Sequence, residues 1–272
     1  MPEFALATAL IATIVAVVYV FLIMPRATEG ADMDLLSTDY AHRGLWDKNH
    51  PENSLGAAAL AVRYGYGIEL DVRLSADGKI VVFHDESLLR MCGVDKKVSA
   101  CKLAELKQMR LLNTRYTIPT LDELLDAVDG RVPLLIEIKG EGKQEKLCRA
   151  LAERLDTYGG SFAIQSFSPL HLGWFKSYRP RFARGQLVTS NKGTKRSVEN
   201  PVIRFAICAM LTNVISRPDF ISISSDRIKS LAFRICVMVF KRRGFVWTVR
   251  KMDSYRLCRR LGLFSIFEKI RP

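Results

Sequence analysis

The sequence lacks the patterns that mark a zinc site or a disulfide framework. It has 6 cysteines and 4 histidines, but no C-x-x-C pair and no cysteine beside a histidine at zinc-ligand spacing. Cys208 and Cys236 instead lie in the apolar runs "FAICAML" and "FRICVMVF". Cysteines in such runs are small buried hydrophobic residues, and they favour a reducing compartment over a disulfide-stabilised protein.

Two further absences limit the possible functions. No glycine-rich phosphate loop follows the first expected strand, which argues against a nucleotide-binding open sheet. No nucleic-acid-binding module is recognisable, so we expect no nucleic-acid partner despite a formal net charge of +13. No feature of the sequence indicates an oligomeric state.

Acidic residues are scarce in only one part of the chain. Residues 174–272 carry 22 Lys and Arg against 5 Asp and Glu, whereas residues 1–173 carry 19 against 23. A basic segment of this kind indicates an anionic partner, such as phosphate or an anionic membrane surface. The alternative is a solvated basic face without a partner.

Charge is absent from residues 4–24, "FALATALIATIVAVVYVFLIM". A helix needs about 20 apolar residues to cross a membrane. No basic segment precedes this run, which argues against a cleaved signal peptide. We therefore expect a transmembrane anchor in residues 1–26, a linker in residues 27–38 and one domain in residues 39–272. The basic flank at Arg26 and the unpaired cysteines place that domain on the cytoplasmic side.

Strand and helix patterns alternate through the domain. Two of the expected helices cover residues 100–112 and 117–128, the second with Thr120 as N-cap and Glu123 as its capping-box partner. About eight strands are expected, at residues 39–44, 68–72, 80–85, 133–139, 162–167, 184–188, 220–224 and 245–249. This alternation predicts an α/β fold with a parallel sheet, most simply a TIM (β/α)₈ barrel, with a doubly wound open sheet as the alternative.

Carboxylates interrupt two of these strands. Glu69 and Asp71 point to one side of their strand, as do Glu137 and Lys139 of another, because side chains alternate with period two. Functional side chains gather at the carboxyl ends of barrel strands. Three buried carboxylates would repel one another, and Mg²⁺ or Ca²⁺ would remove that cost, which predicts a divalent-metal site. A salt-bridge cluster with Lys139 and Arg43 is the alternative.

Two histidines lie at or near the ends of expected strands, close to the same carboxylates. Imidazole exchanges protons near neutral pH, so His42 and His84 are candidates for general acid and base. His50 and His171 have no such neighbours, and we expect them to be surface residues.

The ordered motifs carry a family resemblance. "AHRG", "PENS", "IELDV", "DGKIVVFHD", "LLR", "IPTLDELL", "IEIK", "QSF" and "WTV" follow one another from about residue 39 to the C-terminus. Each motif alone is weak, but the ordered set resembles the glycerophosphodiester phosphodiesterase family. The resemblance implies a TIM barrel with a small insertion after the third strand, at about residues 86–116. It also implies hydrolysis of a glycerophosphodiester to glycerol 3-phosphate and an alcohol, by attack of water or of the substrate's own neighbouring hydroxyl.

The resemblance also implies roles for individual residues. Mg²⁺ or Ca²⁺ would bind Glu69, Asp71 and Glu137, and His42 and His84 would be the acid/base pair. Phosphate contacts would come from Arg43 and Lys139, and an aromatic contact near the glycerol from Trp247. The family's threonines after the "HD" strand are replaced here by "RMCGVDKK", a difference in the insertion that bears on substrate choice more than on the chemistry.

Other functions remain open at this stage. Residues 191–216 and 228–244 contain apolar helical patterns fringed by Arg and Lys. They are either ordinary outer helices of the barrel or a surface that lies against an anionic membrane. A lysophospholipase D that acts on lysophospholipids is therefore one alternative, and a non-catalytic barrel that binds lipid headgroups is another.

Overall fold

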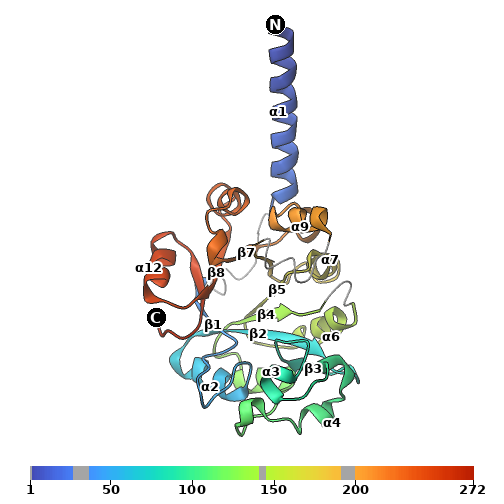
Figure 1. The fold of residues 1–272 in the computed structure, drawn as a ribbon, viewed down its shortest axis with the longest axis vertical. Helices are drawn as coiled ribbons and strands as arrows, with labels where there is room; N and C mark the ends of the chain where they lie inside the picture. The colour runs from blue at the N-terminus through green and yellow to red at the C-terminus, as the bar shows by residue number, and fades with distance from the viewer. Residues whose placement is uncertain (1, 27–36, 141–144, 191–199) are drawn as a thin grey trace.

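The structure is a computed structural model that describes residues 2–26, 37–140, 145–190 and 200–272. Eight parallel strands close into a barrel because the first pairs with both the second and the last (Figure 1). In barrel order these strands are β1 (Tyr40–His42), β2 (Gly67–Leu74), β4 (Leu134–Ile138), β5 (Phe162–Ser166), β6 (Arg184–Val188), β7 (Phe220–Ser224), β8 (Arg243–Val249) and β9 (Phe264–Phe267). The predicted TIM barrel is confirmed.

One strand expected in the barrel lies outside it. β3 (Ile80–Val82) pairs antiparallel with β2, with Val82 opposite Val72. The turn of residues 75–79 between them is far shorter than the crossover that a parallel neighbour requires, so the two strands form a hairpin. The prediction of a parallel strand at residues 80–85 is therefore wrong. Its place in the barrel belongs to β9, which the sequence pattern did not reveal.

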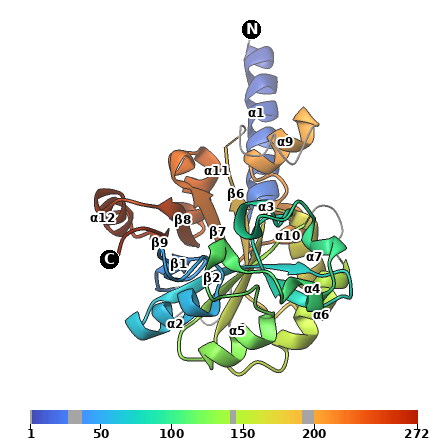
Figure 2. The same cartoon turned by 60° about the horizontal axis from the view of Figure 1, so that its bottom comes forward.

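Helices cover the outside of the barrel (Figure 2). They are α2 (Leu55–Tyr64), α5 (Leu121–Val128), α6 (Glu145–Leu155), α7 (Pro169–Tyr178), α9 (Pro201–Cys208), α10 (Asn213–Ser216), α11 (Leu231–Arg234) with the following η5 (Ile235–Val239), and α12 (Met252–Arg260), with a short turn η4 (Ser225–Arg227) after β7. The predicted capping box of α5 is confirmed, because the Thr120 hydroxyl accepts from the Glu123 N–H and the Glu123 carboxylate accepts from the Thr120 N–H.

A small subdomain follows β3. It contains α3 (Leu89–Cys92), η2 (Val98–Ala100), α4 (Leu103–Leu106) and η3 (Leu111–Asn113), which enclose a separate apolar core. The prediction of one helix over residues 100–112 is wrong, because this range contains the end of η2, the single turn α4 and part of η3. Leu112 has a φ of 48°, a left-handed conformation that no α-helix continues through.

The inside of the barrel changes from apolar to acidic along the strand direction. An apolar layer fills the amino-terminal end, and its members include Tyr40, Leu135, Ala163, Phe220 and Phe245. A Cβ on Gly67 would lie 2.7 Å from the Tyr40 ring, so glycine makes room for this layer. Two residues later on the same face, Gly67 is followed by Glu69 and Leu135 by Glu137, which places carboxylates at the carboxyl-terminal end.

The N-terminal segment is a long helix that projects from the barrel (Figure 1). α1 (Pro2–Ile23) has 22 residues, and almost all of its described side chains are exposed. By length and composition it fits either a membrane-spanning anchor or a signal sequence. The expected linker lies outside the described residues except for its last two positions.

Candidate active site

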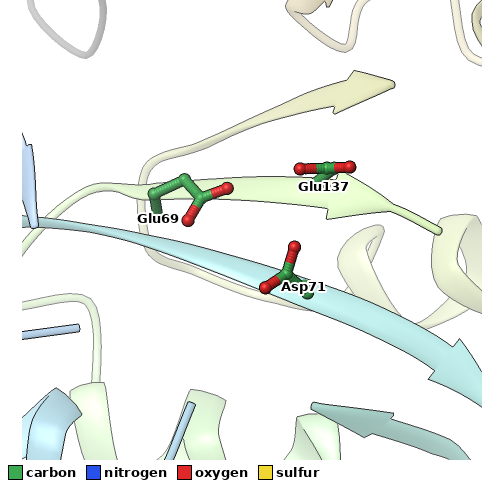
Figure 3. Close-up of side chains that lie close together, drawn as sticks. All are labelled: Glu69, Asp71 and Glu137. Atoms are coloured by element: carbon green, nitrogen blue, oxygen red, sulfur yellow. The ribbon is translucent and has the colours of Figure 1, made fainter. Parts of the chain in front are cut away.

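Three carboxylates converge between β2 and β4. Figure 3 shows Glu69 and Asp71 of β2 facing Glu137 of β4. Asp71 and Glu137 are register partners, and one ligand oxygen of each of the three residues lies within 4.8 Å of the others. Their exposed fractions are only 2 %, 1 % and 6 %. The structure thus brings together the three residues that the sequence predicts as metal ligands.

Two cations lie against this cluster. The Lys139 ammonium is 3.0 Å from Asp71 Oδ1 and 2.5 Å from Glu137 Oε1, and Arg43 Nε is 3.5 Å from Asp71 Oδ2. The ion pairs of the alternative prediction are therefore formed. Two cations do not balance three carboxylates, so the cluster retains an excess of negative charge.

The pKa values follow from burial and from these neighbours. Burial, with repulsion from Asp71 and Glu137, raises the pKa of Glu69 well above its usual value. Burial opposes ionisation of Asp71 as well, but attraction from Lys139, His84 and Arg43 lowers its pKa. The excess negative charge of the cluster therefore opposes the ionisation of Glu69 more than that of Asp71.

Amide side chains hold the two carboxylates of β2 in place. Asn53 Nδ2 donates to Asp71 Oδ2 at 2.8 Å, and Gln165 Nε2 donates to Glu69 Oε1 at 3.2 Å. Gln165 is itself held by the Ser222 hydroxyl at 2.8 Å. Asn53 and Gln165 lie in the motifs "PENS" and "QSF", but nothing in those motifs alone assigns them a contact.

His42 ends β1 and is paired with a residue that the sequence did not single out. Its Nδ1 lies 2.8 Å from Glu268 Oε2, and Arg250 contacts the other oxygen of Glu268. Burial opposes ionisation of Glu268, yet the bonds from His42 and Arg250 lower its pKa to about 2. Burial also lowers the pKa of His42, against the pull of Glu268. Nδ1 therefore holds its proton towards Glu268, and Nε2 is the nitrogen available for chemistry.

His84 follows β3 and has a carboxylate partner of its own. Its Nδ1 lies 2.6 Å from Asp85 Oδ1, and Arg90 Nε lies 2.5 Å from Asp85 Oδ2. Arg90 also donates to Glu52 at 2.6 Å, and Glu52 accepts from Arg43 at 2.7 Å. Asp85, Arg90, Glu52 and Arg43 thus form a chain of alternating charges between His84 and the acidic cluster. Arg90 belongs to α3 of the small subdomain.

One cavity collects most of the predicted residues. Six of the eight line it, namely His42, His84, Glu69, Glu137, Lys139 and Trp247. Asp71 contacts Lys139 of the lining, whereas Arg43 is not among the described lining residues. Trp247 packs edge-on against Phe167 at a centroid distance of 5.6 Å, which gives the cavity an aromatic wall.

The other two histidines lie elsewhere. His171 is only 1 % exposed, and its Nδ1 lies 3.0 Å from the Ser166 hydroxyl, so the prediction of a surface residue is wrong. It belongs to the packing of α7 against β5. His50 is half-buried and pairs with Asp47 at 2.9 Å.

The carboxylate cluster can hold a divalent metal ion. Its donors are all carboxylate oxygens, which Mg²⁺ and Ca²⁺ prefer. A cation would also offset the burial and the repulsion that raise the pKa of Glu69. The residues present therefore fit a metal ion by chemistry and by position.

Known proteins resemble this chain in sequence and in fold. A glycerophosphodiester phosphodiesterase of Bacillus altitudinis is 38 % identical over 107 residues, and one of Caldanaerobacter subterraneus subsp. tengcongensis is 35 % identical over 160 residues. The matches cover 37 % and 54 % of this chain, and 43 % and 65 % of those relatives' own lengths, in each case less than two thirds.

A solved structure shares the barrel fold. It is an Oleispira antarctica phosphodiesterase in complex with its product sn-glycerol-3-phosphate, 24 % identical, with a TM-score of 0.71 over 87 % of this chain and 94 % of that one. The model of the glycerophosphoryl diester phosphodiesterase family matches residues 42–268, from the first cavity histidine to its carboxylate partner. The chain therefore belongs to the glycerophosphoryl diester phosphodiesterase family.

Proposed function

We propose that this protein hydrolyses glycerophosphodiesters to glycerol 3-phosphate and an alcohol. One observation carries the proposal: a single cavity is lined by His42, His84 and Lys139 beside the carboxylates Glu69 and Glu137. The glycerol 3-phosphate bound to the Oleispira antarctica relative supports the same product here.

The two histidines would move the protons of the reaction. One imidazole takes the proton from the attacking oxygen as the new phosphorus–oxygen bond forms. The other gives a proton to the leaving alkoxide as the old bond breaks. Glu268 and Asp85 each bind the Nδ1 side of one ring, which orients His42 and His84 for proton exchange at Nε2.

Positive charge would bind the phosphate. Lys139 lines the cavity and is placed to donate to a phosphate oxygen. Glu69, Asp71 and Glu137 would hold Mg²⁺ or Ca²⁺, whose charge makes the phosphorus more electrophilic. A phosphate contact from Arg43 stays a prediction, because its guanidinium pairs with Glu52 and Asp71. Trp247 would contact the glycerol part of the substrate.

The substrate we favour is a water-soluble headgroup diester rather than a lysophospholipid in a membrane. The end of α1 is held at the amino-terminal ends of barrel strands, where Arg26 N–H donates to Pro218 O at 3.0 Å just before β7. The acidic cluster lies at the opposite, carboxyl-terminal ends. A membrane around α1 would therefore hold the barrel by the end opposite the acidic cluster.

The docking of α1 supports a retained anchor. Ile23 is fully buried, and its carbonyl oxygen accepts from Asn213 Nδ2 at 2.9 Å. Cleavage after α1 would leave an apolar site and a buried amide without partners. We propose that α1 stays in the membrane with the barrel on the cytoplasmic side. The mass of the mature protein tests retention, and protease protection in sealed right-side-out vesicles tests sidedness.

The direct test of activity is release of glycerol 3-phosphate. Purified full-length protein is given glycerophosphocholine or lysophosphatidylcholine, with and without EDTA. The proposal predicts release from glycerophosphocholine that EDTA abolishes and Mg²⁺ or Ca²⁺ restores. Preferential release of lysophosphatidic acid from lysophosphatidylcholine would instead identify a lysophospholipase D. Binding of either compound without turnover would identify a non-catalytic barrel.

A further inference from the structure

Two outer helices expose apolar side chains beside the C-terminal end of α1. We call this set the apolar collar: Val202, Ile203 and Phe205 of α9, with Leu231, Met238 and Val239 of α11 and η5. Their exposed fractions run from 52 % to 74 %. Soluble monomers rarely expose so many large apolar side chains close together, and those that do usually bind a partner or a membrane at that surface.

The collar lies at the level where α1 meets the barrel. Figures 1 and 2 both place α9 on one side of the lower end of α1, and Figure 2 labels α11 on the other. η5 also touches α1 directly, because Cys236 Sγ lies 3.5 Å from Ile23 O. The elements that carry the apolar collar therefore flank the C-terminal end of α1.

The end of α1 is held firmly against the barrel. Arg217 Nη1 donates to the carbonyl oxygens of Phe21 at 3.0 Å and Met24 at 2.8 Å, and its guanidinium lies 4.7 Å from the centre of the Phe21 ring. The side chain of Asn213 binds Ile23 O in the same place. The last turn of α1 is thus part of the barrel surface.

The length of α1 then sets the position of a membrane. Its 22 residues extend about 33 Å at 1.5 Å each, and the hydrocarbon layer is about 30 Å thick. No turn is left over to separate the barrel from the bilayer. The near edge of the hydrocarbon must lie close to Phe21, which is the level of the apolar collar.

The charges around the collar suit anionic headgroups. Residues 201–243 contain 8 Lys and Arg but only 2 acidic residues, Asp219 and Asp226. Asp219 is buried, whereas Lys229, Arg234 and Lys241 are exposed next to the collar residues in sequence. Apolar side chains fringed by cations are typical of surfaces that enter the headgroup layer of an anionic membrane.

We infer that the apolar collar inserts into the interfacial layer of an anionic bilayer around α1. This inference rests on the proposal that α1 is a retained anchor. Three elements, α1, α9 and the α11–η5 segment, then contact the membrane. Contacts at three elements restrict the orientation of the barrel to the bilayer.

The test places a tryptophan in the collar of the full-length protein. Phe205→Trp and Val239→Trp are reconstituted in phosphatidylcholine and phosphatidylglycerol vesicles, with or without brominated acyl chains. Val15→Trp reports on α1, and Leu89→Trp, an exposed site on α3 far from α1, is the matched control. Emission is measured as the increment over wild type, because the chain has 3 tryptophans of its own.

The inference predicts that brominated lipid quenches the added tryptophan emission of Phe205→Trp and Val239→Trp at least about twofold, and that it does not quench the added emission of Leu89→Trp. Quenching at Val15→Trp with unquenched, solvent-exposed collar increments would overturn it and leave the anchor intact. Blue-shifted collar emission without quenching would also overturn it, since a second protein surface would then cover the collar. Collar quenching without quenching at Val15→Trp would support the collar and reject the anchor.

Discussion

The imidazole of His42 and the carboxylate of Glu268 meet at 2.8 Å although 226 residues separate them in sequence. His42 ends β1 and Glu268 follows β9, and these two strands pair to close the barrel. The first and last strands must therefore be paired before this contact exists.

Glu268→Gln should lower turnover by roughly tenfold or more, because a neutral amide no longer holds the Nδ1 proton of His42 in one tautomer. Steady-state kinetics on glycerophosphocholine measure the change, with KM expected to stay nearly constant. Arg250→Ala is the control, since it removes a contact to Glu268 but leaves the carboxylate on His42. Equal turnover in wild type and Glu268→Gln would reject the positioning role.

The same carboxylate makes the stability of the protein sensitive to acid. The pKa of Glu268 is lowered from 4.5 to about 2 in the folded protein, so folding favours its ionised form. Its stabilising contribution is complete above pH 4.5 and is lost as the pH falls towards 2. Urea unfolding should show that Glu268→Gln destabilises the protein near pH 6 and that the difference shrinks below pH 4.5. A difference that is constant with pH would contradict the pKa shift.

His42→Ala and His84→Ala should each lose about 10²-fold or more in turnover on an alkyl diester, the usual scale of general acid–base catalysis. His50→Ala is the control, because His50 pairs with Asp47 and does not line the cavity. Circular dichroism should show that all three variants are folded.

An activated leaving group separates the two roles. A p-nitrophenyl diester needs little protonation as it leaves, so the variant that lacks the general acid should recover most of its turnover on that substrate. The variant that lacks the general base should stay slow. Recovery of neither variant would mean that no histidine protonates the leaving oxygen.

Removal of metal should abolish the activity. Exhaustive EDTA treatment is expected to leave no turnover, and Mg²⁺ or Ca²⁺ should restore it. Glu69→Gln should weaken metal binding measured by calorimetry and lower turnover together, because it removes a charged oxygen ligand. Full activity in protein shown by elemental analysis to be metal-free would reject a metal-dependent reaction.

The barrel interior should not tolerate a methyl group on β6. A Cβ on Gly185 would overlap the ring of Phe220 on β7, which is fully buried. Gly185→Ala should therefore destabilise the protein by about 1–3 kcal/mol, the usual cost of overpacking. Gly159→Ala is the matched control, since a Cβ there meets no atom within 4 Å. Equal urea midpoints for the two variants would show that β6 and β7 shift to accommodate the methyl group.

Local patterns in the sequence determined a large part of the site. The alternation of a strand places Glu69 and Asp71 on one face whatever the rest of the fold does, and a capping box needs only Thr120 and Glu123. The repeated strand–helix rhythm likewise predicts a parallel barrel, and 21 uncharged residues at positions 4–24 predict a helix long enough for a membrane.

The tertiary structure decided what local patterns do not encode. Whether residues 80–82 join the barrel depends on the pairing partner, and a short turn made that partner antiparallel. Glu268 lies beside His42 only because β9 closes the ring, and Asn213 and Cys236 reach Ile23 only because distant helices pack together. These contacts join residues that are far apart in the chain, and periodicity within one segment carries no information about which other segment will lie against it.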